Sequence, residues 1–213
     1  MLPHMTRTQQ RRTAASIKDA YHHGDLRRGL IDAALALVAE GSLADLSLRE
    51  VARRAGVSYG APYHHFADKS ALLAAVARQG FEELVVELER ATVRRTTLQA
   101  QMLAMAEAYV AFAIGHPSHY RVMFLPGVKQ SPDADELHIA ADRAFGLLQE
   151  RVALARVEES ERTHQMLATT VWAALHGLSL LSIDGVLESK YPEPQKMIRS
   201  GCRSIVGMVL EIE

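Results

Sequence analysis

The stretch SLREVARRAGVSYGAPYHHFADK, residues 47–69, contains the most specific structural signal of this chain. Ser47 and Glu50 have the spacing of a capping box, in which the serine accepts from a backbone amide and the glutamate reaches back to the serine amide. Apolar residues then recur at three- and four-residue steps as far as Gly56, which suits the positive φ of a helix C-terminus. Ser58 can cap a second helix. Two short helices joined by a glycine turn are the helix-turn-helix of DNA-binding proteins.

This run closely resembles the DNA-binding signature of the TetR (tetracycline-repressor-like) family of transcriptional regulators. The lead-in YHHGDLRRGLIDAAL, residues 21–35, is similar to that of the family as well. The resemblance implies an all-α chain: a three-helix DNA-binding domain, a shared fourth helix, and a helical domain for effector binding and dimerisation. Pro62 stands where a leucine is commoner in the family, and its missing N–H predicts a tighter or distorted first turn in the recognition helix.

The DNA contacts are expected on both helices of the motif. Arg49 lies in the first turn of its helix, opposite the apolar face, where it can reach a guanine edge or a phosphate. The recognition helix is expected to begin at Ser58, and the residues of its first turn face base edges in this geometry. Tyr63 and Lys69 match family residues that contact DNA, and Lys69 falls at a helix N-terminus, which favours anions. The predicted DNA-binding residues are Ser47, Arg49, Ser58, Tyr59, Gly60, Tyr63, His64 and Lys69.

Other residues of the motif have plainer interpretations. Arg53 and Arg54 are expected on a solvated face, while His65 and Phe66 are expected to pack inward and seat the recognition helix. Lys69 also has a plain alternative as a tolerated surface lysine.

The net charge of −1 over 213 residues hides an asymmetry. The first 80 residues hold eleven Lys and Arg against seven Asp and Glu, whereas the remainder holds 13 against 18. A basic N-terminal part suits a local nucleic-acid footprint. The single cysteine, Cys202, excludes an intrachain disulfide and is expected as a small buried hydrophobe. No apolar run of transmembrane length and no signal peptide is evident, so we expect no membrane partner and a cytoplasmic protein.

Three regions are expected along the chain. Residues 1–20 are predicted to be a disordered basic arm, with contact to DNA phosphates or a minor groove as the alternative. Residues 21–92 are the expected DNA-binding domain, which begins with a helix at 25–39 and includes the linking helix from Lys69. Residues 93–213 are the expected effector-binding and dimerisation domain, with helices at 97–114, 117–125, 133–156, 161–187 and 194–212. No stretch alternates with the period of a strand, and no repeat is evident.

The C-terminal half contains methionine and aromatic side chains that suit an apolar small-molecule pocket. At helical spacing such residues are equally typical of plain core, and both interpretations remain open. Tyrosine, histidine and tryptophan side chains could turn polar tips inward to orient a ligand. The predicted effector-binding residues are Met105, Tyr109, Phe112, Tyr120, Met123, Phe124, Trp172 and His176, with Met102, His116 and Phe145 as further candidates.

The stretch between residues 166 and 187 is apolar on nearly all sides, which predicts a helix buried on both faces. The resemblance implies that this helix and the last one pair with their symmetry mates in a four-helix interface. The trio Trp172, His176 and Gly177 also resembles a C-terminal subfamily named for a Trp-His-Gly pattern. The predicted dimer interface comprises Val171, Ala174, Gly177, Leu178, Ile198, Cys202, Ile205 and Val209.

Catalytic motifs are absent from the sequence: there is no G-x-S-x-G, H-E-x-x-H, P-loop or G-x-G-x-x-G. The adjacent pairs His22-His23 and His64-His65 point to different sides of a helix and do not chelate. We therefore predict no enzyme, no cofactor and no metal site. The expected function is sequence-specific binding of double-stranded DNA by a homodimer, by resemblance a repressor that a small-molecule effector releases from a palindromic operator. A helical ligand- or metal-sensing protein that does not touch DNA remains the alternative.

Overall fold

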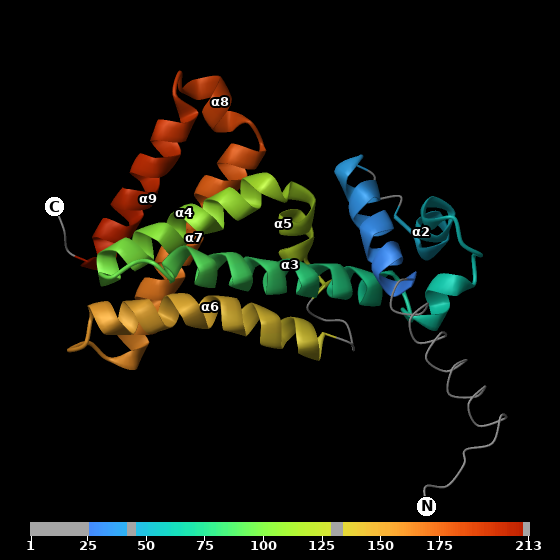
Figure 1. Cartoon of the computed structure of the whole chain (residues 1–213), viewed down its shortest axis with the longest axis horizontal. Coiled ribbons are helices and arrows are strands. Elements are labelled where there is room, and N and C mark those ends of the chain that lie inside the picture. The colour runs from blue at the N-terminus through green and yellow to red at the C-terminus, as the bar shows by residue number, and fades with distance from the viewer. Residues whose placement is uncertain (1–25, 42–45, 129–133, 211–213) are drawn as a thin grey trace, which may run out of the picture. The chain divides into compact units, whose positions relative to one another are not determined.

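The computed structural model of the chain describes residues 26–41, 46–128 and 134–210 (Figure 1). The predicted N-terminal arm, residues 1–20, lies outside them. All regular structure in the described segments is helical, as predicted. The chain divides into two compact units, residues 1–72 and 73–213. The division falls within helix α3 (Lys69–Thr92), most of which belongs to the second unit. The domain boundary expected after residue 92 remains a prediction.

The first unit contains a helix at residues 26–39, helix α2 (Leu48–Ala55), the 3₁₀ helix η1 (Ala61–His64) and the start of α3. The predicted ends of α2 are confirmed. Ser47 Oγ accepts from the backbone N–H of Glu50 at 3.2 Å, and Gly56 ends the helix at φ 68°. The core of this unit comprises Leu30, Ile31, Ala34, Leu37, Leu46, Leu48, Val51, Ala52 and Phe66, all buried.

Only half of the predicted capping box forms. The carboxylate of Glu50 accepts from Arg53 instead of reaching back to Ser47, with a distance of 2.9 Å between Arg53 Nε and Glu50 Oε2. A guanidinium one turn along the helix is a stronger donor for a carboxylate than a backbone amide, because its hydrogen bond is charge-assisted.

The recognition segment differs from the predicted helix beginning at Ser58. The structure has a turn followed by η1, and the N-cap residue is Gly60. A helix capped by Ser58 would need the N–H of residue 62 to bond the Ser58 carbonyl, and Pro62 has none. The Ser58 carbonyl accepts from Ala61 N–H at 3.0 Å instead, which produces the tighter turn.

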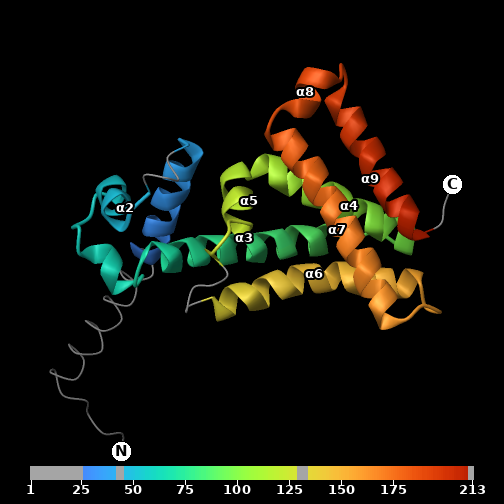
Figure 2. The same ribbon diagram turned by 180° about the vertical axis from the view of Figure 1, so that it is seen from behind.

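The second unit is a helical bundle. It contains most of α3 and then α4 (Leu98–Gly115), α5 (Pro117–Met123), α6 (Asp135–Ala155), α7 (Glu161–Ile183), α8 (Val186–Lys190) and α9 (Pro194–Leu210). Helix α7 packs against α4, α6 and α9, and α4 also packs against α9. Helix α6 runs beside α3 in both views (Figures 1 and 2), and ion pairs join Arg78 to Glu136 and Arg143 to Glu89.

The helix predicted at 161–187 is in fact two helices. Helix α7 ends at Ile183, and Gly185 adopts φ 71° before α8 begins. The left-handed conformation, which glycine adopts without strain, ends the first helix and turns the chain. The predicted helix at 117–125 likewise ends earlier, at Met123.

By length and composition, α7 is apolar enough to cross a membrane, contrary to the sequence analysis. Core helices of soluble proteins have the same character. Only 28% of its most apolar stretch is buried within the chain, although α7 packs against three other helices. The chain therefore leaves much apolar surface of this helix uncovered.

Candidate nucleic-acid interface and effector cavity

The predicted DNA-binding residues of the first unit lie on or near its surface. Seven of them are exposed, and Lys69 is half-buried. Tyr59 and Tyr63 are 55% and 56% exposed, so their rings are not part of the core. Their phenol groups combine a hydrogen-bonding tip with a flat apolar ring, a combination common at binding surfaces.

Arg49 connects α2 to the recognition segment. Its guanidinium carbon lies 5.2 Å from the centroid of the Tyr59 ring, a distance suited to a cation–π interaction. Within the described part of the chain, no carboxylate forms an ion pair with Arg49. Among these residues, an aromatic ring and not a carboxylate therefore holds the Arg49 charge in place.

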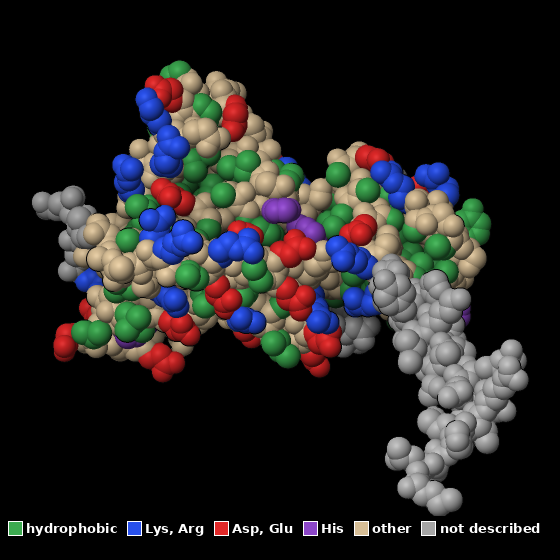
Figure 3. Space-filling model, in the orientation of Figure 1, with side chains coloured by type: hydrophobic (Ala, Val, Ile, Leu, Met, Phe, Trp, Pro, Cys, Tyr) green, Lys and Arg blue, Asp and Glu red, His purple; other side chains and the backbone are tan. Residues whose placement is uncertain are grey.

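The neighbouring arginines are arranged differently. Arg53 pairs with Glu50, and Arg54 pairs with Glu40. These hydrogen bonds lower the pKa of both carboxyls, so both pairs are charged at neutral pH. Basic and acidic side chains lie next to one another on the surface around α2 (Figure 3). The solvated face predicted for Arg53 and Arg54 agrees with this arrangement.

Lys69 is the first residue of α3. Asp68 Oδ1 accepts from the backbone N–H of Ala71 at 2.8 Å and so caps this helix. A side-chain cap satisfies one of the four amides that a helix leaves unbonded at its N-terminus, so the end remains favourable for an anion. Phe66 is buried as predicted, and the Arg27 guanidinium lies 5.3 Å from its ring centroid.

The second unit contains a cavity of about 200 Å³. Four predicted effector-binding residues line it, namely Met105, Tyr109, Phe124 and Trp172, and so do the further candidates Met102 and Phe145. Its wall also includes residues that the sequence analysis did not propose as effector contacts: Phe81, Leu84, Leu88, Ala106, Ala141, Asp142, Ala144, Leu148, Val171, Leu175 and Val206.

Four other predicted effector residues do not line the cavity. Phe112 and Met123 are buried in the surrounding core. Tyr120 and His176 stand behind the wall and bond to it: Tyr120 Oη lies 2.7 Å from His176 Nδ1 and 2.9 Å from Tyr109 Oη. They support the orientation of Tyr109 and do not contact the cavity themselves.

Tyr109 is the polar centre of the cavity wall. Its Oη accepts from the Tyr120 hydroxyl and from Trp172 Nε1 at 3.1 Å. Burial raises the pKa of Tyr109 far above its ordinary value and that of Tyr120 to about 12, so both hydroxyls keep their protons. Burial also lowers the pKa of His176, which favours the neutral imidazole. The network is therefore uncharged at neutral pH.

Most of the predicted dimer interface is buried inside the chain. Val171, Ile198, Cys202, Ile205 and Val209 are between 0% and 9% exposed, so they belong to the core beneath the helix surfaces. Ala174, Gly177 and Leu178 remain partly exposed. Hydrophobicity alone could not separate the two faces, because both faces of α7 are apolar.

The cavity residues contributed by α3 have a sequence signal that is typical of a helix face and does not mark a cavity. Phe81, Leu84 and Leu88 recur at three- and four-residue spacing, which predicts one apolar face. Whether such a face meets other side chains or a cavity depends on the packing of the whole bundle.

Comparison with known proteins identifies two matching families. Residues 30–76 match the bacterial regulatory proteins of the tetR family, and residues 102–204 match the tetracyclin repressor-like C-terminal domain. The resemblance to a Trp-His-Gly subfamily remains a prediction.

Curated relatives match over part of their length. The HTH-type transcriptional regulator BetI of Cronobacter sakazakii is 36% identical over 83 residues, which is 38% of this chain and 41% of that protein. The BetI of Serratia proteamaculans is 50% identical over 52 residues, which is 24% of this chain and 26% of that protein. The chain thus matches less than half the length of these curated relatives.

Solved structures match over most of the chain. A protein of unknown function from Rhodococcus sp. RHA1 has a TM-score of 0.72 at 31% identity, and the match covers 90% of this chain and 96% of that one. The fatty acid degradation regulator FadR of Bacillus halodurans has a TM-score of 0.63 at 14% identity, covers 86% and 94%, and shows likeness of fold alone. The two family matches cover the unit that contains the helix-turn segment and the unit that contains the cavity. The chain therefore belongs to the TetR family of bacterial regulatory proteins.

Proposed function

We propose that this protein is a sequence-specific DNA-binding transcriptional regulator whose first unit contacts double-stranded DNA. The observation that carries the proposal is the exposure of Arg49, Tyr59 and Tyr63 in the segment that leads into α3, with Arg49 packed against the Tyr59 ring. Arg49 supplies a cation that can read a base, while the tyrosine hydroxyls, Lys69 and the helix end supply phosphate contacts. Such a regulator acts in the cytoplasm, and no catalytic role is proposed.

A small apolar effector with a hydrogen-bond acceptor suits the cavity of the second unit. The wall is mainly aliphatic and aromatic, and Asp142 supplies the only carboxylate among the described residues that line it. In the tautomer where His176 Nδ1 carries the proton, the imidazole donates to Tyr120, Tyr120 donates to Tyr109, and the Tyr109 hydrogen is left to donate. A carbonyl or ether oxygen is the group that this hydrogen would bind.

Dimerisation through α7 and α9 is the second part of the proposal. Met166, Thr170, Ala173, Gly177 and Leu181 recur at three- and four-residue steps along one partly exposed stripe of α7. Met197 and Met208 are exposed on α9. Pairing of these stripes with a second copy would cover the apolar surface that the chain leaves open. This interface replaces the buried residues proposed from sequence.

Control by the effector would follow from a difference in affinity. An effector that binds the DNA-free conformation more tightly shifts the population away from DNA. We propose that the protein represses transcription and that the effector relieves this repression, in keeping with the family resemblance.

Selection of genomic fragments by the purified protein tests the DNA-binding proposal. We expect enrichment of one inverted-repeat sequence, with an affinity that falls as salt is raised. The alternative, a helical sensor that does not touch DNA, predicts that no fragment is enriched at any salt concentration. That outcome would overturn the proposal.

Tryptophan fluorescence can report effector binding, because Trp172 is the only tryptophan of the chain and lines the cavity. We expect apolar carbonyl compounds to change its fluorescence saturably and to release the selected DNA at similar concentrations. Tyr109→Phe should weaken these compounds more than matched hydrocarbons, since it removes the proposed hydrogen-bond donor. Equal weakening of both ligand classes would contradict the assigned donor.

A further inference from the structure

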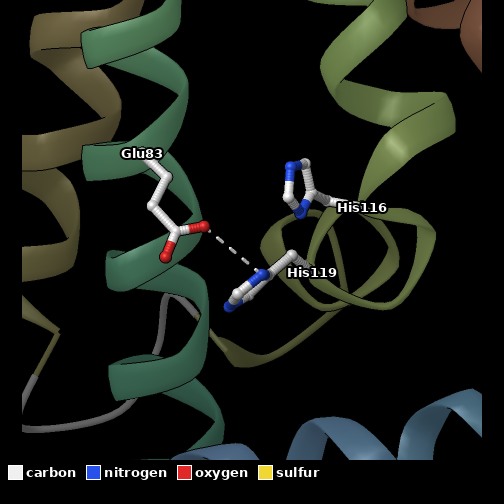
Figure 4. A group of neighbouring side chains, drawn as sticks. All are labelled: Glu83, His116 and His119. Carbon is white, nitrogen blue, oxygen red and sulfur yellow. Dashed lines mark ion pairs between the residues drawn. The ribbon is translucent and has the colours of Figure 1, made fainter.

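Glu83, His116 and His119 lie together although they come from different elements (Figure 4). Glu83 is on α3, His116 is the N-cap residue of α5, and His119 is in α5. Their potential ligand atoms all lie within 4.8 Å of one another. We propose that these three side chains form a binding site for a divalent transition-metal ion of the Zn²⁺, Ni²⁺ or Co²⁺ kind. The proposal does not depend on DNA binding.

The ligand set suits such a metal. Two imidazoles and one carboxylate are the three protein ligands of several zinc sites, where water or another ligand occupies a fourth position. Mg²⁺ and Ca²⁺ prefer oxygen ligands, so two histidines argue against them. Ligand atoms of a tetrahedral site with bonds of about 2.0–2.2 Å are about 3.3–3.6 Å apart. His119 Nδ1 and Glu83 Oε2 are already 3.6 Å apart.

Surrounding contacts orient the carboxylate for this role. Gln79 Nε2 donates to Glu83 Oε1 at 2.8 Å, while the other carboxylate oxygen is the one near His119. Hydrogen bonds of this type from neighbouring side chains position metal ligands in proteins. The His116 ring lies 4.9 Å from the Phe112 ring at 32°, so an aromatic contact from α4 supports this ligand.

The two helices approach closely beside the cluster. A Cβ added at Gly80, three residues before Glu83, would lie 2.7 Å from Met123 Sδ and 3.6 Å from His119 Cβ. Ligands fixed on packed helices keep their geometry better than ligands on loops. A bound ion would therefore bridge α3 and α5 at a place where the backbones are already close.

The three residues differ in exposure, so the cluster is accessible to an ion from solvent. His119 is buried, Glu83 is half-buried and His116 is exposed. Histidine side chains reach the surface over α5, next to acidic side chains (Figure 3). A simple ion pair between Glu83 and His119 would account for two of the residues, but it gives no reason for His116 to lie within reach of both.

From the sequence we predicted no metal site, because the adjacent histidine pairs do not chelate. The His116-x-x-His119 spacing was a usable signal, because residues three apart in a helical turn lie on the same side. Glu83 precedes this pair by more than thirty residues, and its proximity depends on the packing of α3 against α5.

Titration of the full-length, chelator-treated protein with Co²⁺ tests the site, with visible absorption as the readout and Zn²⁺ as competitor. We expect a tetrahedral-type Co²⁺ band that one equivalent of Zn²⁺ abolishes. His116→Ala and Glu83→Gln should each weaken the affinity by roughly 100-fold or more, since even supporting residues of metal sites contribute 10–100-fold. His116→Ala is the primary variant because this exposed side chain can be removed without opening the core.

His138→Ala is the matched control, because His138 is an exposed histidine of α6 outside the cluster. This variant should retain the band and the affinity. No Co²⁺ band in the wild type would overturn the proposal. So would a band that persists with equal affinity in His116→Ala and Glu83→Gln, because the ion would then be bound by other histidines of the chain.

Discussion

Arg49 and Lys69 present two kinds of positive charge on the first unit. Arg49 is exposed and lies against the Tyr59 ring, which restricts the planar guanidinium before DNA arrives. Lys69 sits at the beginning of α3, where a compact ammonium group adds to the helix end. A fixed planar donor suits a base edge, and a point charge suits a phosphate. Replacement of the two residues should therefore change DNA binding in different ways.

Arg49→Ala should weaken binding to the operator by about 1–3 kcal/mol and relax the preference at one base pair of each half-site, because a bidentate contact to guanine is lost. Binding to a panel of single-base operator variants measures both effects. Arg53→Ala is the control, since Arg53 is exposed but paired with Glu50, and it should change the preference little. Uniform weakening across the whole panel by Arg49→Ala would make Arg49 a phosphate contact instead.

Lys69→Ala should weaken binding to all DNA sequences alike and reduce the slope of log K against log salt by about one unit, because one phosphate contact is lost. Measurements of affinity at several salt concentrations give the slope directly. Lys196→Ala, which removes an exposed lysine of α9, should leave the slope unchanged. An unchanged slope for Lys69→Ala would remove this lysine from the interface.

At the scale of elements, local chemistry predicted the helix ends better than the conformation between them. The cap at Ser47 and the left-handed end at Gly56 agree with the sequence, because each depends on a single residue and the backbone groups nearest to it. The effect of Pro62 was only partly foreseen: a distorted turn was expected, whereas the whole segment became a 3₁₀ helix. The break at Gly185 was missed, because a glycine within an apolar run can also continue a helix.

Site residues that depend on contacts between distant parts of the chain were likewise harder to predict from the sequence. Tyr109 and Trp172 could be predicted as cavity residues because their side chains combine an apolar body with a polar tip. The contributions of α3 to the cavity and to the Glu83 cluster could not, since they depend on which face of α3 meets the bundle. Likewise, the sequence marked α7 and α9 as apolar without separating their core faces from the surface that a partner could cover.

Gly80 and Gly146 allow a test of the close contact between α3 and α5. Alanine in a helix interior normally stabilises by about 0.5–1 kcal/mol relative to glycine. We expect that gain for Gly146→Ala, where no atom of the segments that the structure describes lies within 4 Å of the added Cβ. Gly80→Ala should instead lower the free energy of unfolding by about 1 kcal/mol, because Met123 is fully buried and must shift.

Urea denaturation of both variants and the wild type supplies the comparison. Equal stabilisation by both alanines would mean that α3 and α5 are further apart than described. The proposed metal site would then lose the close helix packing on which its geometry depends.

At the scale of the whole molecule, the uncovered apolar surface of α7 predicts a partner. Gly177 lies on the partly exposed stripe, and a Cβ added there meets no atom of the described residues within 4 Å. Gly177→Leu should therefore fold normally and dissociate the dimer through a clash with the second copy. Sedimentation velocity at micromolar concentration distinguishes monomer from dimer.

Gly146→Leu is the matched control for this experiment, since it adds the same side chain at an open position on α6. It should remain dimeric. A Gly177→Leu protein that also sediments as a dimer would place the interface elsewhere on the molecule.

A hydroxyl-radical footprint of the wild-type protein on its selected genomic fragment shows whether two copies bind one operator. We expect two protected half-sites related by two-fold symmetry, with centres about 34–36 Å apart as two recognition segments in successive major grooves require. Gly177→Leu should lose simultaneous protection of both half-sites at the same protein concentration. Protection of no discrete site by the wild-type protein, or of a single unpaired site, would contradict a dimeric, sequence-specific regulator.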